Sequence, residues 1–271
     1  MKEFSLSKKV ILVTGANGLI GTEISDALAS AGASLVLLDS TPLKVLKKLE
    51  MKLRKKFKIK IKSFSCDIGN DKEVLNCVKS ICSYFGRIDV LINLAAIDAK
   101  VDTIKKNSKK ISFHNFPLDL WKKSININIT GTFLITKFVI KEMIKKKSGN
   151  IINVASTYSL VAPNHDLYKI NDKQEFFKPI DYIATKSMIP NFTRYITTLY
   201  GKKGIRANTI VPHGVINSPS AAFKKNFSKL SPMGRICDKK ELRGPFVFLS
   251  SDASSYMNGS TLIVDGGWTA W

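Results

Sequence analysis

The stretch Val10-Ile11-Leu12-Val13-Thr14-Gly15-Ala16-Asn17-Gly18-Leu19-Ile20-Gly21 decides the fold of this chain. Its first five residues are apolar and mostly β-branched, which predicts a short buried strand. Three glycines follow, and Ile24, Leu28 and Ala31 then recur at helical spacing until Gly32 ends the helix. Glycines let a backbone approach a pyrophosphate, and a helix N-terminus offers free N–H groups at the positive end of its dipole. Strand, glycine turn and helix together predict a dinucleotide-binding site.

Strand-like and helical patterns alternate along the rest of the chain. Strands are expected at 10–14, 34–39, 59–66, 90–93, 150–156, 205–211 and 260–264, and helices at 43–56, 72–85, 118–147, 182–202 and 239–250. This alternation predicts an α/β fold, a Rossmann-like doubly wound parallel sheet of about seven strands with helices on both faces. In such sheets the ligand lies beyond the carboxyl ends of the strands. No internal repeat or linker is visible, so residues 1–271 are interpreted as one domain.

Three segments break the periodicity. Residues 98–117 are polar and lysine-rich and are interpreted as a loop over the cleft. Residues 163–180 have no period, and 217–232 are interpreted as a mobile stretch. The helical pattern at 118–147 carries asparagine and glycine around Asn128, and these poor mid-helix residues indicate a functional kink.

The composition is that of a soluble globular protein, with 44% apolar and 24% charged residues. No apolar run approaches the roughly 18 residues of a membrane span, and no secretion signal is recognisable at the N-terminus. The four cysteines have no metal or redox spacing, which suits a reducing cytoplasm, and the three histidines show no metal spacing either. A cytoplasmic protein without a metal or membrane partner is expected.

The net charge of +22 raises the alternative of a nucleic-acid binder. Only six of the 43 basic residues are arginine, whereas specific phosphate and base recognition relies on arginine forks. A solvated lysine-rich surface is therefore the preferred interpretation, and nucleic acid is not an expected partner. Such a surface could steer an anionic substrate toward the protein.

Asp39 ends the second predicted strand, where an acidic residue accepts hydrogen bonds from the adenosine ribose hydroxyls. Its charge would repel the 2′-phosphate of NADP, and no arginine or lysine occupies positions 16, 17 or 40 to offset that repulsion. NAD is therefore favoured over NADP. The alternative is a surface aspartate that caps the next helix. Asp67 follows the third strand, where it could hold the adenine.

Tyr182-Ile183-Ala184-Thr185-Lys186 places a tyrosine and a lysine one helical turn apart on one face. A nearby ammonium favours the phenolate and lowers the tyrosine pKa, which would make Tyr182 a general acid–base. The alternative is a half-buried tyrosine beside a solvated lysine, because this spacing is common by chance.

Together these motifs resemble the short-chain dehydrogenase/reductase family over essentially the whole chain. The matching pieces occur in family order at 14–21, Asp39, Asp67, 93–96, Asn128, Ser156, Tyr182 with Lys186, 212–217 and 265–267. The resemblance implies an NAD(P)-dependent enzyme that interconverts an alcohol and a ketone by hydride transfer.

The resemblance also implies a role for each catalytic residue. Tyr182 passes the proton, and Lys186 lowers the tyrosine pKa and binds the nicotinamide ribose. Ser156 hydrogen-bonds the reacting oxygen, and Asn128 holds a water of the proton relay. The helices that carry Asn128 and Tyr182 usually pair across a dimer axis, so a homodimer or homotetramer is expected.

The expected cofactor-binding residues come from the glycine turn and from the strand ends. Val215 and Asn217 fall where the nicotinamide carboxamide is usually held. The full set is Gly15, Asn17, Gly18, Leu19, Ile20, Gly21, Asp39, Asp67, Ile68, Asn93, Ala95, Tyr182, Lys186, Pro212, Val215 and Asn217.

The chain departs from the shorter branch of the family in several places, among them Leu94, His213 and Asn217, where Asn, Gly and Thr are usual. The middle glycine is Gly18, the spacing of the longer branch, and the segment between Ser156 and Tyr182 is about twice the usual length. We interpret 163–180, like 98–117, as a substrate-side insertion. Within and near it, the candidates for substrate contact are His165, Tyr168 and His213, for which the alternative is a loop or packing role.

The insertion, the turn Pro212-His213-Gly214-Val215 and the tail 267–271 resemble the flagellin modification protein A type of bacterial oxidoreductase. That resemblance implies an anionic sugar phosphate or nucleotide sugar as the substrate, in nonulosonate synthesis for surface glycans. Two alternatives stay open. One is a 3-oxoacyl-thioester reductase, which would use NADP, and the other is a catalytically idle NAD-binding protein.

Overall fold

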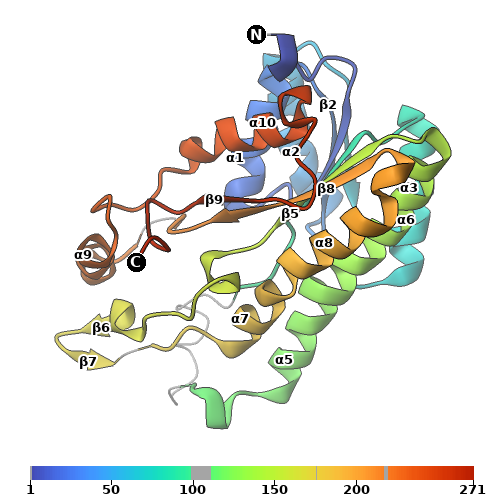
Figure 1. Cartoon of the computed structure of the whole chain (residues 1–271). Coiled ribbons are helices and arrows are strands. Elements are labelled where there is room, and N and C mark those ends of the chain that lie inside the picture. The colour runs from blue at the N-terminus through green and yellow to red at the C-terminus, as the bar shows by residue number, and fades with distance from the viewer. Residues whose placement is uncertain (1, 99–110, 175, 217–218) are drawn as a thin grey trace.

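The computed structural model describes residues 2–98, 111–174, 176–216 and 219–271. A seven-stranded parallel sheet lies at its centre, in the strand order β3-β2-β1-β4-β5-β8-β9 (Figure 1). The strands are β1 (Val10–Thr14), β2 (Ser34–Asp39), β3 (Ile61–Ser65), β4 (Val90–Asn93), β5 (Gly149–Val154), β8 (Ile205–Pro212) and β9 (Thr261–Val264). The predicted Rossmann-like fold is confirmed.

Helices cover both faces of the sheet (Figure 1). On one face lie α1 (Leu19–Ser30), α2 (Leu43–Lys56) and α10 (Arg243–Ser250), and on the other lie α3 (Asp71–Phe85), α6 (Thr132–Lys146) and α8 (Ile189–Tyr200). The remaining described helices are α5 (Leu118–Ser124), α7 (Ile180–Ser187) and α9 (Ala221–Leu230). The central strands β1 and β4 are buried on both faces, so their sequences are nearly continuous apolar runs rather than alternating ones.

The strand order reverses between β1 and β4, which both pair with parallel neighbours at this point. Leu12 of β1 lies opposite Val36 of β2 on one side and Leu91 of β4 on the other. The connections from β1 and from β4 therefore leave toward opposite faces and open a crevice at the carboxyl edge.

A chain of buried polar side chains crosses the face of the sheet under α6 and α8. Asn93 Nδ2 donates to Thr136 Oγ1 at 2.9 Å and to Asn153 Oδ1 at 2.7 Å. Asn153 Nδ2 donates in turn to Thr193 Oγ1 at 2.9 Å, and Thr193 accepts from Thr209 at 2.8 Å. Asn153, Thr193 and Thr209 have no exposed surface, so these bonds replace water and fix both helices against the sheet.

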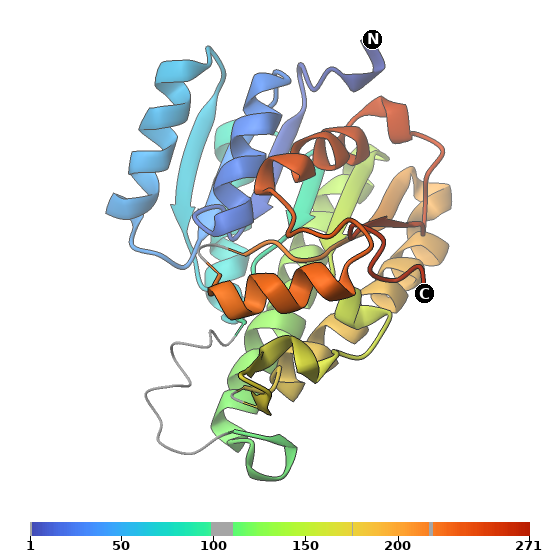
Figure 2. The ribbon, with the colours of Figure 1, turned by 90° about the vertical axis from the view of Figure 1, so that its left-hand side faces the viewer.

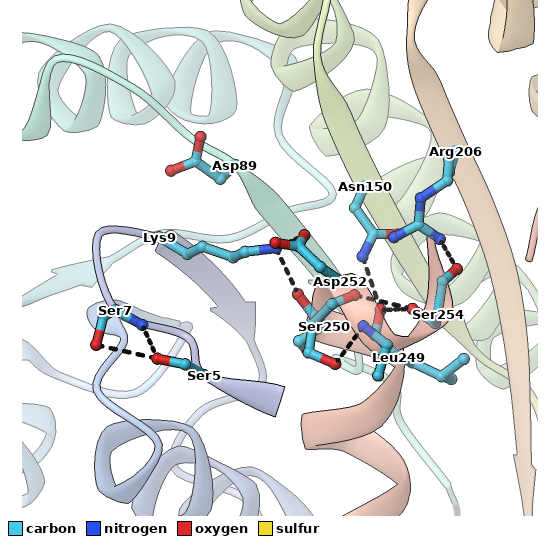
Figure 3. Close-up of polar contacts among 12 residues, drawn as sticks. Ser5, Ser7, Lys9, Asp89, Asn150, Arg206, Leu249, Ser250, Asp252 and Ser254 are labelled. Atoms are coloured by element: carbon cyan, nitrogen blue, oxygen red, sulfur yellow. Dashed lines mark hydrogen bonds and ion pairs between the residues drawn. The ribbon is translucent and has the colours of Figure 1, made fainter. Parts of the chain in front are cut away.

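At the opposite, amino-terminal edge, polar contacts tie α10 and the turn after it to the strands (Figure 3). Lys9 Nζ lies 2.6 Å from Asp252 Oδ1, and Asn150 Nδ2 donates to the carbonyl of Leu249 at 2.8 Å. Arg206 Nη1 donates to the carbonyl of Ser254 at 2.9 Å. Side chains at this edge satisfy the carbonyls at the end of α10, which leaves the carboxyl edge for ligands.

The helical segments agree with one prediction and contradict another. The interruption expected around Asn128 is confirmed, because π-helical turns at η3 (Ile125–Gly131) separate α5 from α6. The mobile stretch expected at 217–232 is wrong for 221–230, which form α9 with Ser220 as its N-cap. Phe223, Phe227 and Leu230 recur at helical spacing there, a signal that the surrounding lysines and serines obscured.

The insertion at 163–180 has structure of its own. It contains the short helix η5 (His165–Tyr168) and an antiparallel hairpin of β6 (Lys169–Ile170) and β7 (Lys173–Gln174). The expected helix at 182–202 begins earlier, at Ile180, and is divided into α7 and α8 at Met188. The loop expected at 98–117 lies mostly outside the described residues. Within the described residues, no helix has the length and apolarity needed to cross a membrane.

We expect Asn153→Ala to lower the free energy of unfolding by about 2 kcal/mol, because it removes two buried hydrogen bonds and leaves a small cavity. Urea unfolding followed by circular dichroism measures the change. Asn191→Ala is the matched control, because Asn191 is exposed on α8 beside Thr193 and its replacement should change stability by less than about 0.5 kcal/mol. Equal stability of the two variants would show that the polar chain contributes nothing.

Candidate active site

A cleft of about 460 Å³ lies beyond the carboxyl ends of the strands. The glycine turn, the ends of β2 to β5 and the end of β8 form one side of it. The insertion and α9 form the other, and α9 lies across the strand ends with the β6–β7 segment beside it (Figure 2). The cleft therefore has two ends. We call the end at the glycines the cofactor end and the end under the insertion the substrate end.

The glycine turn is shaped so that side chains cannot fill it. Gly15 has a φ of +68°, and a Cβ there would lie 2.9 Å from Cα of Ala95. A Cβ on Gly21 would lie 2.1 Å from the carbonyl oxygen of Gly15. Gly18 is the N-cap of α1 and provides no side chain to satisfy its first N–H groups. Free donors in a cradle without side chains fit the pyrophosphate of a dinucleotide.

The cofactor end is closed by acidic and small residues. Asp39 Oδ2 accepts from the backbone N–H of Asn17, and Asp39 Oδ1 accepts from that of Thr41, both at 3.0 Å. These bonds fix the carboxylate at the wall of the cleft, beside Asp67 and Ile68. Among described residues, the basic side chains that line the cleft are Lys178 and Lys186, both at the substrate end.

Some of the other predicted cofactor residues line the cleft and some do not. Ala95, Pro212 and Val215 line the cleft, whereas the side chain of Asn93 points into the sheet toward Asn153. Only the backbone of Asn93 could therefore face a cofactor. Asn217 lies outside the described residues.

Ser156, Tyr182 and Lys186 line the cleft together at its substrate end. Ser156 follows β5, and α7 brings Tyr182 and Lys186 to the same wall. Lys186 Nζ donates to the carbonyl of Val154 at 2.7 Å and lies 5.9 Å from the centre of the Tyr182 ring. Two side chains from one helix and one from a neighbouring strand end thus surround a shared space.

Burial controls the electrostatics of this group. Burial raises the pKa of Tyr182, the carboxylate of Asp98 adds to the rise, and a hydrogen bond with Ser156 opposes it. Burial also lowers the pKa of Lys186 to about 8. Burial is the largest influence on the pKa of Tyr182 in this structure, and the lowering of that pKa by Lys186 stays a prediction.

Asn128 lies in the π-helical turns next to this group. Its Oδ1 accepts from the N–H of Ile97 at 2.8 Å, and its Nδ2 donates to the Ile97 carbonyl and to Thr185 Oγ1, each at 3.0 Å. The side chain therefore ties the segment after β4 to α7. Whether Asn128 also holds a water stays a prediction.

The three predicted substrate residues lie in different surroundings. Tyr168 and His213 line the cleft, but His165 does not, because its ring packs edge-on against Phe177 inside the insertion. His213 is buried, and its ring lies 4.3 Å from that of Trp268. Burial lowers the pKa of His213 to about 4, so it is a neutral polar group at the wall.

Sequence reasoning missed four further side chains that line the substrate end, and these are Asp98, Tyr158, Phe223 and Phe227. Lys178, which belongs to the predicted substrate-side insertion, lines it as well. The helical spacing of the two phenylalanines could have indicated their shared face. Nothing in the sequence pairs Asp98 with Lys178, because the fold alone brings these distant positions together. Within the described residues, no group of histidine, cysteine, aspartate and glutamate could hold a metal ion.

Comparison with known proteins agrees with this geometry. A family model described as enoyl-(acyl carrier protein) reductase matches residues 15–269. The 2-dehydro-3-deoxy-D-gluconate 5-dehydrogenase of Pseudoalteromonas atlantica is 28% identical over 99% of this chain and 98% of its own. The 3-oxoacyl-(acyl-carrier-protein) reductase of Buchnera aphidicola subsp. Schizaphis graminum is 32% identical over 97% of this chain and 98% of its own.

Two solved structures have the same architecture. A gluconate 5-dehydrogenase from Burkholderia cenocepacia, in complex with NADP and tartrate, has a TM-score of 0.85 at 28% identity and covers 100% of this chain and 98% of its own. An NAD⁺-bound xylitol dehydrogenase has a TM-score of 0.82 at 27% identity, with 97% and 99% covered. The chain belongs to the short-chain dehydrogenase/reductase family, whose members are NAD(P)-dependent oxidoreductases that act on CH–OH groups.

Proposed function

We propose that the protein uses NAD to interconvert a secondary alcohol and a ketone on an anionic sugar derivative, such as a sugar phosphate or nucleotide sugar. The observation that carries this proposal is that Ser156, Tyr182 and Lys186 line the same cleft as the glycine turn. A cofactor seated on the glycines reaches along the cleft to these residues.

Each residue would contribute one step. The hydroxyls of Ser156 and Tyr182 would hold the reacting oxygen, and Tyr182 would take its proton as the alcohol is oxidised. Bound NAD supplies the hydride acceptor. Lys186, which is buried and directed by the Val154 carbonyl, would hold the ribose of the nicotinamide, and Asn128 would keep α7 in place through Thr185.

Asp39 supports the choice of NAD. Its carboxylate is fixed by two backbone N–H groups at the cofactor end, and the described basic residues of the cleft lie at the other end. A 2′-phosphate would meet a fixed negative charge without a cation beside it. The related structures hold either cofactor, so they do not decide between the two.

The wall formed by the insertion supports a sugar substrate. Tyr168 offers an aromatic face and a hydroxyl, and Lys178 offers a cation. The named relatives include dehydrogenases of a sugar acid and of a polyol. We extend the proposal to surface-glycan synthesis of the flagellin modification type, on the resemblance of the insertion and the tail.

The reductase relative favours a second candidate, a 3-oxoacyl-thioester reductase. That function would use NADP, against which Asp39 argues. The idle NAD-binding alternative is less suited to a cleft in which Ser156, Tyr182 and Lys186 are all present.

The proposal also covers the domain organisation, the localisation and the oligomeric state of the enzyme. We propose one domain over residues 1–271, with substrate-side insertions at 98–117 and 163–180, in a cytoplasmic homodimer or homotetramer. Phe133 on α6 and Tyr195 and Leu199 on α8 are large apolar side chains that are 46–65% exposed, which favours helix pairing between subunits.

For the cofactor, we expect the wild-type protein to bind NAD at least about tenfold more tightly than NADP, a difference of about 1.4 kcal/mol. Asp39→Ser should reduce that preference, because it removes the charge that repels the 2′-phosphate. Isothermal titration calorimetry of both cofactors measures it. Asp172→Ser, in the turn of the β6–β7 hairpin, is the control and should leave the preference unchanged. Equal binding of both cofactors by the wild type would contradict the assignment.

For the chemistry, Tyr182→Phe should lower turnover by at least about a hundredfold, the usual scale for a general acid–base group. NAD affinity should stay nearly unchanged, because the glycine turn and Asp39 are untouched. A panel that includes D-gluconate, xylitol, sugar phosphates and nucleotide sugars identifies the substrate through reduced cofactor. Tyr256→Phe is the control, because Tyr256 is fully exposed and does not line the cleft. Near-normal turnover by Tyr182→Phe would show that Tyr182 is not the general acid–base.

For the substrate wall, Tyr168→Ala should raise KM by about tenfold or more and leave NAD affinity unchanged, because Tyr168 lines only the far end of the cleft. Lys173→Ala, at the exposed tip of the same insertion, should alter neither quantity. If Tyr168→Ala is folded and has a normal KM for the identified substrate, the insertion does not form the wall.

A further inference from the structure

A second lysine lies against Tyr182, and the proposed mechanism gives it no part in proton transfer. Lys178 Nζ is 4.2 Å from the centre of the Tyr182 ring, closer than Lys186 Nζ at 5.9 Å. The side chain of Lys178 is only 11% exposed. Lys178 comes from the end of the insertion and lines the cleft, so it reaches Tyr182 from the substrate side.

Asp98 holds this lysine in place. Both carboxylate oxygens of Asp98 lie 2.6 Å from Lys178 Nζ. Asp98 follows β4, and Lys178 precedes α7, so the ion pair joins two segments that are far apart in the chain. A buried lysine with two contacts to one carboxylate has little freedom to leave the ring of Tyr182.

A cation in this position acts differently on the two forms of tyrosine. The negative charge of a phenolate spreads into the ring, so an ammonium over the ring stabilises the phenolate far more than the neutral phenol. The carboxylate of Asp98 has the opposite effect and raises the pKa of Tyr182. The ion pair therefore places two opposite charges near Tyr182. The positive charge, that of Lys178, is the one that contacts the ring.

The other titratable groups around this pair are few among the described residues. They are Lys186 on α7, Tyr158 on η4 (Thr157–Ser159), Tyr168 on η5 and His213 at the end of β8. The adjacent Asp181 is directed away, toward a hydrogen bond with Ser124 of α5. Lys178 and Asp98 are thus the charged side chains that approach Tyr182 from the substrate side.

We propose that Lys178, held by Asp98, is a positioning residue that stabilises the phenolate of Tyr182 through its contact with the tyrosine ring. The insertion then contributes to proton transfer as well as to the substrate wall. This inference rests on the proposed function, in which Tyr182 is the general acid–base. The competing role for Lys178, a direct contact with an anionic substrate, would change KM without changing the titration of Tyr182.

The test follows the titration of Tyr182 itself. The enzyme is labelled with carbon-13 at tyrosine Cζ and saturated with NAD, and the Tyr182 signal is assigned by its loss in Tyr182→Phe. Lys178→Met keeps the length of the side chain and removes its charge, so the titration should move to higher pH by about one unit.

Two variants separate charge from packing. Lys178→Arg keeps the charge, so its titration should stay within a few tenths of a pH unit of the wild type. Lys173→Met removes a lysine from the exposed tip of the insertion and should have no effect. Far-ultraviolet circular dichroism and NAD affinity confirm that each variant is folded.

The outcomes are distinct. A shift to higher pH in Lys178→Met that Lys178→Arg does not show supports the inference. An unchanged or lowered titration in Lys178→Met, with or without a raised KM, overturns it and leaves Tyr182 as the acid–base. Normal turnover by Tyr182→Phe would instead overturn the proposed function, whatever the titrations show.

Discussion

The close approach of β1 and β4 at the reversal of the strand order is the constraint on which the site depends. Thr14 Oγ1 accepts from the N–H groups of Leu94 and Ala95, both at 3.1 Å, and binds the two strand ends together. Gly15 then passes so near Ala95 that a side chain would collide with its backbone. The crevice, the exposed N-terminus of α1 and the direction of the cofactor end all follow from this contact.

Burial sets the second condition of the site. In the proposed mechanism Tyr182 must lose its proton, but it lies where desolvation favours the neutral form. Desolvation likewise favours the neutral amine of Lys186. Hydrogen bonds compensate for part of the lost hydration and fix the geometry of the site. Lys186 donates to the Val154 carbonyl, and Asn128 donates to Thr185 of α7. A second cation over the ring, Lys178, is a further offset that leaves Tyr182 in a dry environment.

The sequence predicted what depends on local pattern. Glycine spacing predicted the turn at Gly15–Gly21, strand ends predicted Ser156 and Asp39, and the poor helix formers around Asn128 predicted the π-helical interruption. It missed what depends on contacts between distant segments. The pairing of Asp98 with Lys178 has no local signal, and the inward packing of His165 on Phe177 follows from the fold of the insertion rather than from its composition.

The packing of the insertion explains how it can serve two roles at once. Asn226 of α9 donates to the carbonyls of Asp166, Leu167 and Lys169, and the buried Leu167 packs with Phe227 and Trp268. One end of the insertion is thereby fixed to α9, while its other end leads directly into α7 and Tyr182. A substrate that contacts this wall therefore contacts the same segment that carries Lys178. Recognition and proton transfer would then be linked through one stretch of chain, because the wall residue Tyr168 and the cation of Lys178 belong to the same insertion.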